Sequence, residues 1–157
     1  MDVSDSAPER ERPRATYLVK HLELAVRAHL DQAIGELGLT TPQYAALSVL
    51  VSKPGTLSAE LARRSFVSPQ AMNEMVLVLE RKGLIRREAS PRHKRRLEIF
   101  LTEHGQELLR QCEKRADEVE DLVFAALSSA EREMLRRLLR KCSDTFASTQ
   151  AAPARST

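Results

Sequence analysis

The sequence predicts a mainly α-helical fold with one small β-hairpin. Its composition favours aliphatic helices, because hydrophobic residues make up 42% of the chain, aromatic residues only 4%, and glycines number five. Apolar residues recur at helical spacing over most of the length. Between residues 58 and 101, two short helical patterns joined by a turn are followed by a basic segment with two extended runs. This order of elements is that of a winged helix-turn-helix.

The first two helices are predicted by apolar periodicity and by the residues that interrupt it. Residues 16–37 fit one long amphipathic helix, and Gly38 ends it. Thr41-Pro42 is typical of the start of a second helix, which Pro54-Gly55 closes. The side chains expected to face the core from this second helix are Tyr44, Leu47, Leu50 and Val51.

The next two helices form the predicted helix-turn-helix. Ser58–Arg64 gives a short helix, and Ser68 is a good N-cap for the following one because its hydroxyl can accept a bond from a first-turn amide. Pro69 suits the first helical position. The face of this helix expected to be buried carries Met72, Met75, Val76 and Leu79. The opposite face is polar near its N-terminal end, as in a recognition helix that enters the major groove of DNA.

A highly charged hairpin, the wing, is predicted after this helix. Gly83 ends the helix, Leu84-Ile85 begins a strand, and residues 97–101 return. Residues 81–96 hold eight Lys or Arg against one acid, a local net charge of +7, whereas the whole chain carries +3. An isolated basic run is as often a solvated loop as a binding surface. Beside a polar-faced helix, however, it matches the electrostatic footprint of nucleic-acid binding.

Two further helices are predicted after the wing. From Thr102 an apolar stripe continues to Ala126, and a capping-box pattern at Ser128-Ser129-Ala130-Glu131 opens a last helix. The first of these two stripes is longer than one small domain needs. The two stripes either close an intramolecular bundle or form a helical dimerisation platform for a second copy. Because an exposed aliphatic stripe invites aggregation, the sequence favours a homodimer.

Several of these segments resemble a known family. Residues 57–105 resemble the winged-helix domain of the MarR (multiple antibiotic resistance regulator) family, and the flanking helices extend the resemblance over about residues 17–146. The motifs that carry it are Ser58-Ala59-Glu60-Leu61-Ala62, Leu79-Glu80-Arg81-Lys82-Gly83-Leu84-Ile85, Pro91-Arg92-His93-Lys94-Arg95 and Leu101-Thr102-Glu103-His104-Gly105.

Two positions depart from the family pattern. His93 stands where the wing commonly has an Asp, and Val78 stands where the recognition helix often has an Arg. If those two family residues pair to brace the wing, this chain must hold its wing in another way.

The resemblance implies a division of the chain into one domain and two tails. It implies a MarR-like domain over residues 16–147, between flexible tails at 1–15 and 148–157. Within the domain, the winged helix-turn-helix would occupy about residues 42–101. The dimerisation helices would occupy about residues 16–37 and 102–147.

The predicted DNA contacts lie on both helices of the motif and on the wing. Gln70 and Asn73 are the expected base readers, because a side-chain amide can make two bonds to the major-groove edge of adenine. Ser68 and either Arg63 or Arg64 are expected at phosphates. Glu74 would repel phosphate, so it either accepts from a cytosine amino group or pairs with a neighbouring Arg. The full candidate set is Arg63, Arg64, Ser68, Gln70, Ala71, Asn73, Glu74, Arg92, Lys94, Arg95 and Arg96.

The expected DNA target is an inverted repeat. Two copies related by a two-fold axis would present two recognition helices about one turn of double-stranded DNA apart. The resemblance places the family's wing-tip Arg on Arg95, in or beside the minor groove. A narrow A-tract would attract this Arg through its strong negative potential.

The resemblance also implies a repressor that a small ligand releases from DNA. The implied effector is a small aromatic acid or a phenolic compound, bound between the dimerisation helices and the winged lobe. Arg87 is the expected anion partner, since it matches a wing-base Arg of the family and a guanidinium suits a carboxylate. Tyr17 and His21 are weaker ligand candidates. Surface packing of the Tyr and solvent exposure of the His are the stronger interpretations for these two.

The two cysteines allow two interpretations. Cys112 and Cys142 lie on the apolar stripes of different helices, where a thiol usually behaves as a small buried hydrophobe. A redox-responsive regulator that uses either cysteine, for example through a disulfide between copies, is the alternative.

The sequence offers no signature of an enzyme. It has no glycine-rich phosphate loop, no nucleophile elbow and no metal-ligand spacing of His, Cys and carboxylates, so neither a cofactor nor a metal is expected. Residues 1–15 lack an apolar run, which predicts a cytoplasmic, nucleoid-associated protein with no membrane partner. The remaining alternative is an architectural nucleic-acid-binding protein without sequence preference.

Overall fold

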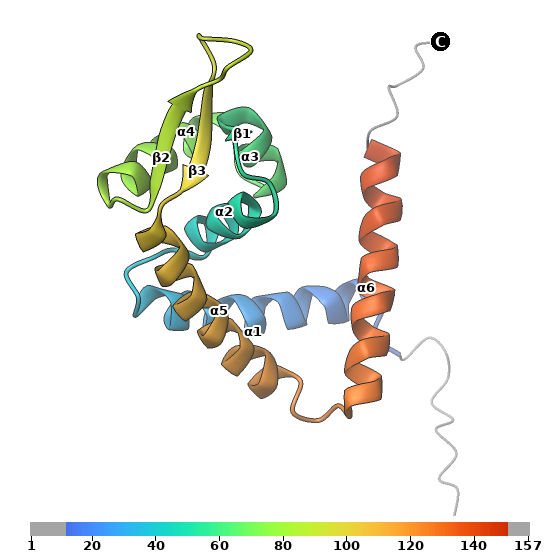
Figure 1. Ribbon diagram of the computed structural model, residues 1–157. Coiled ribbons are helices and arrows are strands. Elements are labelled where there is room, and N and C mark those ends of the chain that lie inside the picture. Colours follow the sequence, from blue (N-terminus) through green and yellow to red (C-terminus); the bar gives the residue numbers. More distant parts are fainter. Residues whose placement is uncertain (1–11, 151–157) are drawn as a thin grey trace, which may run out of the picture. The chain divides into compact units, whose positions relative to one another are not determined.

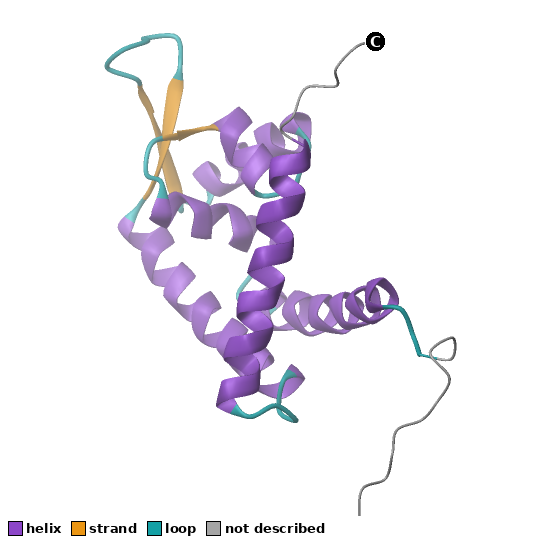
Figure 2. Ribbon diagram, turned by 90° about the vertical axis from the view of Figure 1, so that its right-hand side faces the viewer, coloured by secondary structure: helices purple, strands orange, loops and turns teal. Residues whose placement is uncertain are grey.

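The computed structural model describes residues 12–150, and the predicted tails at 1–15 and 148–157 lie outside this range except for their inner ends. The predicted mainly α-helical fold with a small wing is confirmed (Figures 1 and 2). Within the described residues the elements are α1 (Ala15–Gly35), α2 (Thr41–Ser52), β1 (Thr56–Leu57), α3 (Ser58–Arg64), α4 (Pro69–Arg81), β2 (Ile85–Ala89), β3 (Leu97–Leu101), α5 (Glu103–Val123) and α6 (Ser129–Gln150).

The chain forms two compact units, with the boundary between Glu120 and Asp121 on α5. The first unit holds the winged helix-turn-helix together with α1 and most of α5. The second holds the end of α5 and α6. None of the described helices is both long and apolar enough to cross a membrane.

The wing is an antiparallel hairpin to which a third, very short strand is added. The strand order is β1-β3-β2, with Arg87 opposite Ile99 and Thr56 opposite Ile99 on the other side. The Ser90 N–H donates to the Arg96 carbonyl across 2.8 Å and closes the loop that extends beyond the strands (Figure 1). The sequence predicts β2 and β3 but not β1, because two residues are too few to show an alternating pattern.

The core of the first unit lies where α2, α3 and α4 meet the sheet and α5. The largest fully buried side chains are Ile34, Leu47, Leu50, Leu61, Met72, Leu79, Leu84, Ile99 and Cys112. The apolar face predicted for α4 is therefore confirmed. Val51, predicted to face inward, is 55% exposed instead. It directly follows the buried Leu50, and one helical step of about 100° turns it out of the core.

Two glycines allow the close approach between the wing and the helices on either side of it, α4 and α5. Gly83 has φ +70, a left-handed conformation that lets the chain leave α4 and enter β2. A Cβ on Gly105 would lie 2.0 Å from the Leu84 carbonyl oxygen, so only glycine allows α5 to start this close to the wing. The Thr102 hydroxyl completes the joint by donating to the Gly83 carbonyl across 2.6 Å.

In the second unit, α6 begins with the predicted capping box. The Ser128 N–H donates to the Glu131 carboxylate across 2.8 Å, and the Glu131 N–H donates to the Ser128 hydroxyl across 3.3 Å. Arg132 donates to Asp121 across 2.6 Å and to the Phe124 carbonyl across 3.1 Å, which fixes the turn before α6. The apolar stripe that follows stays exposed, with Leu138 at 51%.

Candidate nucleic-acid interface

The N-terminal half of α4 presents an exposed polar edge. Ser68 caps the helix as predicted, its hydroxyl accepting from the Ala71 N–H across 3.1 Å. Gln70, Asn73 and Glu74 are exposed. Glu74 forms no ion pair with any described residue, so of its two predicted roles the pairing with a neighbouring Arg is not seen. The packing of Met72 and Val76 beneath this edge holds it outward.

Asn73 is held by the preceding helix. The hydroxyl of Ser58, the first residue of α3, donates to Oδ1 of Asn73 across 2.7 Å. Gln70, one turn earlier on α4, has no side-chain hydrogen bond to any described residue. The two predicted base readers therefore differ. The Asn73 amide is hydrogen-bonded through its oxygen, whereas both ends of the Gln70 amide remain without a partner among the described residues.

The wing loop carries cations that the described part of the protein leaves without partners. Arg92, Lys94, Arg95 and Arg96 are all exposed. Across residues 12–150, none of them has an ion pair or a side-chain hydrogen bond within the chain. Their charges are thus free to meet an external anion, as the sequence predicts for a phosphate-binding surface.

The basic residues on α3 are different, because they share one acid. Glu60 lies 2.9 Å from Nε of Arg64 and 3.8 Å from Arg63. The hydrogen bond from Arg64 is the largest cause that lowers the pKa of Glu60 below its ordinary value. Arg63 and Arg64 therefore present less net positive charge than the wing loop does.

The base of the wing is braced by an ion pair between β2 and α4. Nη2 of Arg87 donates to Oε2 of Glu80 across 2.5 Å, and Nε donates to the same oxygen across 3.1 Å. This bond is the largest cause that lowers the pKa of Glu80 and raises that of Arg87. With His93 and Val78 at the positions where the family often has an Asp and an Arg, the Glu80–Arg87 pair ties the wing to the recognition helix.

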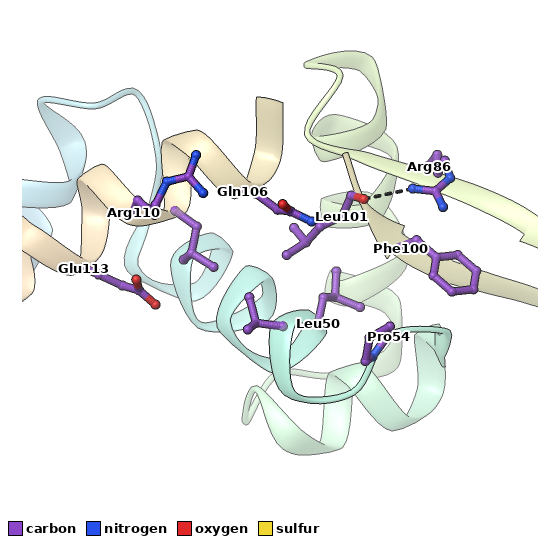
Figure 3. A pocket seen from close by; sticks show the side chains of 10 residues that line it. Leu50, Pro54, Arg86, Phe100, Leu101, Gln106, Arg110 and Glu113 are labelled. Carbon is purple, nitrogen blue, oxygen red and sulfur yellow. Dashed lines mark hydrogen bonds between the residues drawn. The ribbon is translucent and has the colours of Figure 1, made fainter. Parts of the chain in front are cut away.

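Arg86 provides a second brace on the other side of β2. Its Nη1 donates to the Leu101 carbonyl across 2.9 Å, its Nε donates to Glu88 across 2.6 Å, and its guanidinium lies 5.1 Å from the centre of the Phe100 ring. Figure 3 shows it at the edge of a hollow of about 510 Å³ between α2, β3 and the start of α5. The polar rim of this hollow is formed by Gln106, Arg110 and Glu113.

Arg87 lines a separate hollow of about 650 Å³ between α3, α4 and β3. Ser58, Asn73, Arg95 and Arg96 line it too, over an apolar floor that includes Val76 and Ile99. The predicted anion partner thus lies beside predicted DNA contacts.

Tyr17 and His21 are not among the residues that line this hollow. They lie on α1, where their rings stack with centres 6.1 Å apart. Both are exposed in the single chain.

The two cysteines have opposite environments. Cys112 is fully buried, as predicted, and burial raises the pKa of its thiol, which disfavours the reactive thiolate. Cys142 is exposed in the single chain, so the prediction that it is buried is wrong for one copy taken alone. The α6 stripe on which it lies has no covering helix within the described part of its own unit.

The sequence does not single out Ser58, Glu80 or Arg86 for the roles they have here. Each lies in or beside a family motif, but its partner comes from another element. The sequence spacing of such a pair, 15 residues between Ser58 and Asn73 or 7 between Glu80 and Arg87, gives no periodic signal.

Comparison with known proteins supports the assignment that the fold and site indicate. Residues 37–96 match the sequence model of the MarR family. The chain is 34% identical over 141 residues to the HTH-type transcriptional repressor Rv2887 of Mycobacterium tuberculosis, an alignment that covers 90% of this chain and 97% of Rv2887.

Solved structures of Rv2887 agree with this relationship. The complex of Rv2887 with salicylic acid superposes with a TM-score of 0.71 at 33% identity, over 85% of this chain and 98% of that one. Its complex with DNA gives a TM-score of 0.71 at 30% identity, over 83% and 98%. The chain therefore belongs to the MarR family of winged helix-turn-helix transcriptional regulators.

Proposed function

We propose that the protein is a homodimeric repressor that binds an inverted repeat in double-stranded DNA and is released by a small aromatic acid or phenol. The observation that carries this proposal is the exposed polar edge of α4 beside a wing loop whose Arg92, Lys94, Arg95 and Arg96 have no partner among the described residues. Polar side chains can read base edges, and unpaired cations bind phosphates. The relative Rv2887 is a repressor with a solved DNA complex, which supports the same role here.

The dimer part of the proposal rests on apolar side chains that the single chain leaves exposed. On α1 these are Tyr17, Leu18, Val19 and Leu24, and from the end of α5 onward they are Leu122, Met134, Leu138 and Leu139. Exposed apolar area of this extent is typical of a surface that a second copy covers. The predicted dimerisation helices, residues 16–37 and 102–147, contain all of these side chains.

Sedimentation tests the dimer directly. We expect a species of twice the 17.7 kDa chain mass. Leu138→Glu, on the exposed stripe, should convert it to a monomer, because a buried unpaired carboxylate is costly. Arg140→Glu, on the other face of α6, is the control and should leave the dimer intact. A wild-type monomer at micromolar concentration would contradict the proposal.

Selection of bound duplexes from a random pool tests the DNA part. We expect one inverted repeat with half-sites about one turn apart, held at least about 10³-fold more tightly than random duplex. Equal affinity for the selected repeat and for random duplex would instead indicate the architectural alternative. The selection repeated with an oxidant tests the redox alternative, for which Cys142 is the exposed thiol.

For the effector, Arg87 supports an anion site in the hollow between α3, α4 and β3. This place differs from the one that the resemblance implied, because none of the described residues that line the hollow belongs to the dimerisation helices. Its volume of about 650 Å³ is within the range of small-molecule sites. A carboxylate bound there would compete with Glu80 for the Arg87 guanidinium. Salicylic acid, which a solved structure of Rv2887 contains, is the natural first probe.

The effector test is release from the selected duplex. Salicylate and related aromatic acids should lower the affinity of wild-type protein, and Arg87→Gln should weaken this response. Tyr17→Phe and His21→Ala test the two weaker candidates in the same assay. Release that is unchanged in Arg87→Gln would remove Arg87 from the ligand site.

A further inference from the structure

We propose that Ser58 determines which base Asn73 reads, by holding the Asn73 amide with its oxygen toward α3 and its NH2 group toward the DNA. This inference rests on the proposed sequence-specific DNA binding and deepens it. It makes Asn73 a reader of guanine rather than a two-bond partner of adenine.

The residue that orients the Asn73 amide lies on another helix. The Ser58 hydroxyl donates to Oδ1 of Asn73 across 2.7 Å. Ser58 is half-buried at the start of α3, and Asn73 is exposed on α4. The N-cap of α3 is Leu57, and no side chain caps this helix start. The hydroxyl of Ser58 does not act as a cap and is directed to Asn73 on the next helix. The bond crosses between the two helices of the motif, and it fixes a side chain at the proposed DNA surface.

The chemistry follows from the two ends of an amide. An Asn side chain has an acceptor oxygen and a donor NH2 on one carbon, and adenine recognition uses both at once. Because Ser58 already engages the oxygen, the group that Asn73 offers outward is the NH2 donor. Guanine presents two acceptors, N7 and O6, on its major-groove edge, whereas cytosine presents an amino donor there. A fixed donor therefore favours guanine and rejects cytosine.

Gln70 provides a comparison within the same helix. Its amide lies one turn before Asn73, is exposed, and has no side-chain hydrogen bond to any described residue. It keeps both the oxygen and the NH2 for a base, so its expected partner is adenine. The recognition helix thus carries one open amide and one oriented amide. A half-site with adenine opposite Gln70 and guanine opposite Asn73 is expected.

The experiment compares duplexes selected from a random pool by the full-length wild type, Ser58→Ala, Asn73→Ala and the double variant. Wild type should enrich guanine at one position of each half-site. Ser58→Ala frees the amide oxygen, so the ratio of guanine to adenine at that position should fall by roughly fivefold or more, the discrimination of one good bidentate pair. Asn73→Ala should lose preference there, and adding Ser58→Ala should change nothing further.

The controls separate base choice from general loss of binding. Ser58→Thr keeps the hydroxyl and should keep guanine, and thermal unfolding verifies that each variant is folded. Two results would overturn the inference: adenine at that position in wild type, or an equal weakening of all duplexes by Ser58→Ala with no change in the selected base. If wild type selects no sequence at all, the proposed function itself fails, which is a different outcome.

Discussion

The five arginines of the wing hairpin fall into two groups with opposite environments. Arg86 and Arg87, at the base of the wing, are held by Leu101, Glu88 and Glu80. Arg92, Arg95 and Arg96, in the wing loop, are exposed and have no ion pair within the described residues. The same residue type therefore has two different roles in the hairpin. At the base it joins the strands to each other and to α4. In the loop its charge stays exposed to solvent.

The largest expected effect concerns the joint under the wing. Gly105→Ala would place a Cβ 2.0 Å from the Leu84 carbonyl oxygen, so backbone must move. We expect a loss of about 3 kcal/mol in the free energy of unfolding, measured by chemical denaturation. Gly35→Ala is the matched control, because nothing lies within 4 Å of its added Cβ. If both variants were equally stable, the base of the wing would not be anchored as described.

The next effect separates the two groups of arginines in DNA binding. Arg95→Ala should weaken binding to every duplex, roughly fivefold for one phosphate contact at physiological salt, and lower the slope of log affinity against log salt by about 1 per protomer. Its thermal unfolding should equal that of wild type. Arg86→Ala should instead act mainly on stability. It should lower the unfolding temperature, because three contacts of this side chain are lost. An unchanged salt slope in Arg95→Ala would remove the wing loop from the interface.

A smaller effect is expected from the brace between β2 and α4. Glu80→Gln leaves Arg87 without its carboxylate partner, so the unfolding temperature should fall, by less than in Gly105→Ala, since both side chains are about one-third exposed. Glu74→Gln is the control, an acid on the same helix that forms no ion pair with a described residue. It should not change the unfolding temperature. Equal unfolding temperatures of Glu80→Gln and wild type would mean that the pair does not brace the wing.

The smallest effect is the pH dependence of that brace. In the folded protein the pKa of Glu80 lies below its ordinary value of 4.5, mainly because Arg87 donates to it. Its stabilisation is therefore fully present above pH 4.5 and is lost as the pH falls through the lowered pKa. The difference in stability between wild type and Glu80→Gln should shrink over that acid range, as measured by urea denaturation at several pH values. A difference that grew with acid would contradict the ion pair.

Local signals explain why most of the winged lobe was predictable from the sequence. Ser68 and Pro69 identify the start of α4, and the predicted bounds of α3, Ser58–Arg64, match the observed ones. Gly83 marks the end of α4 because its left-handed conformation favours glycine. These features depend on near neighbours in the chain, so they are visible without coordinates.

Features that depend on distant partners were not predictable in the same way. Periodicity places Val51 beside the core and Cys142 on an apolar stripe, yet both are exposed. Whether a helix face is covered depends on what packs against it, which helical spacing alone does not determine.

The sequence by itself determined the order of elements, the polar edge of α4 and the concentration of positive charge at residues 81–96, because periodicity, capping and charge are local properties of the chain. Only the tertiary structure decided how the charge is divided, pairing Arg87 with Glu80 while leaving Arg95 exposed, and that Ser58 holds the Asn73 amide. The physical reason is that a hydrogen bond depends on distances of about 3 Å between atoms, and folding sets those distances for residues on different elements.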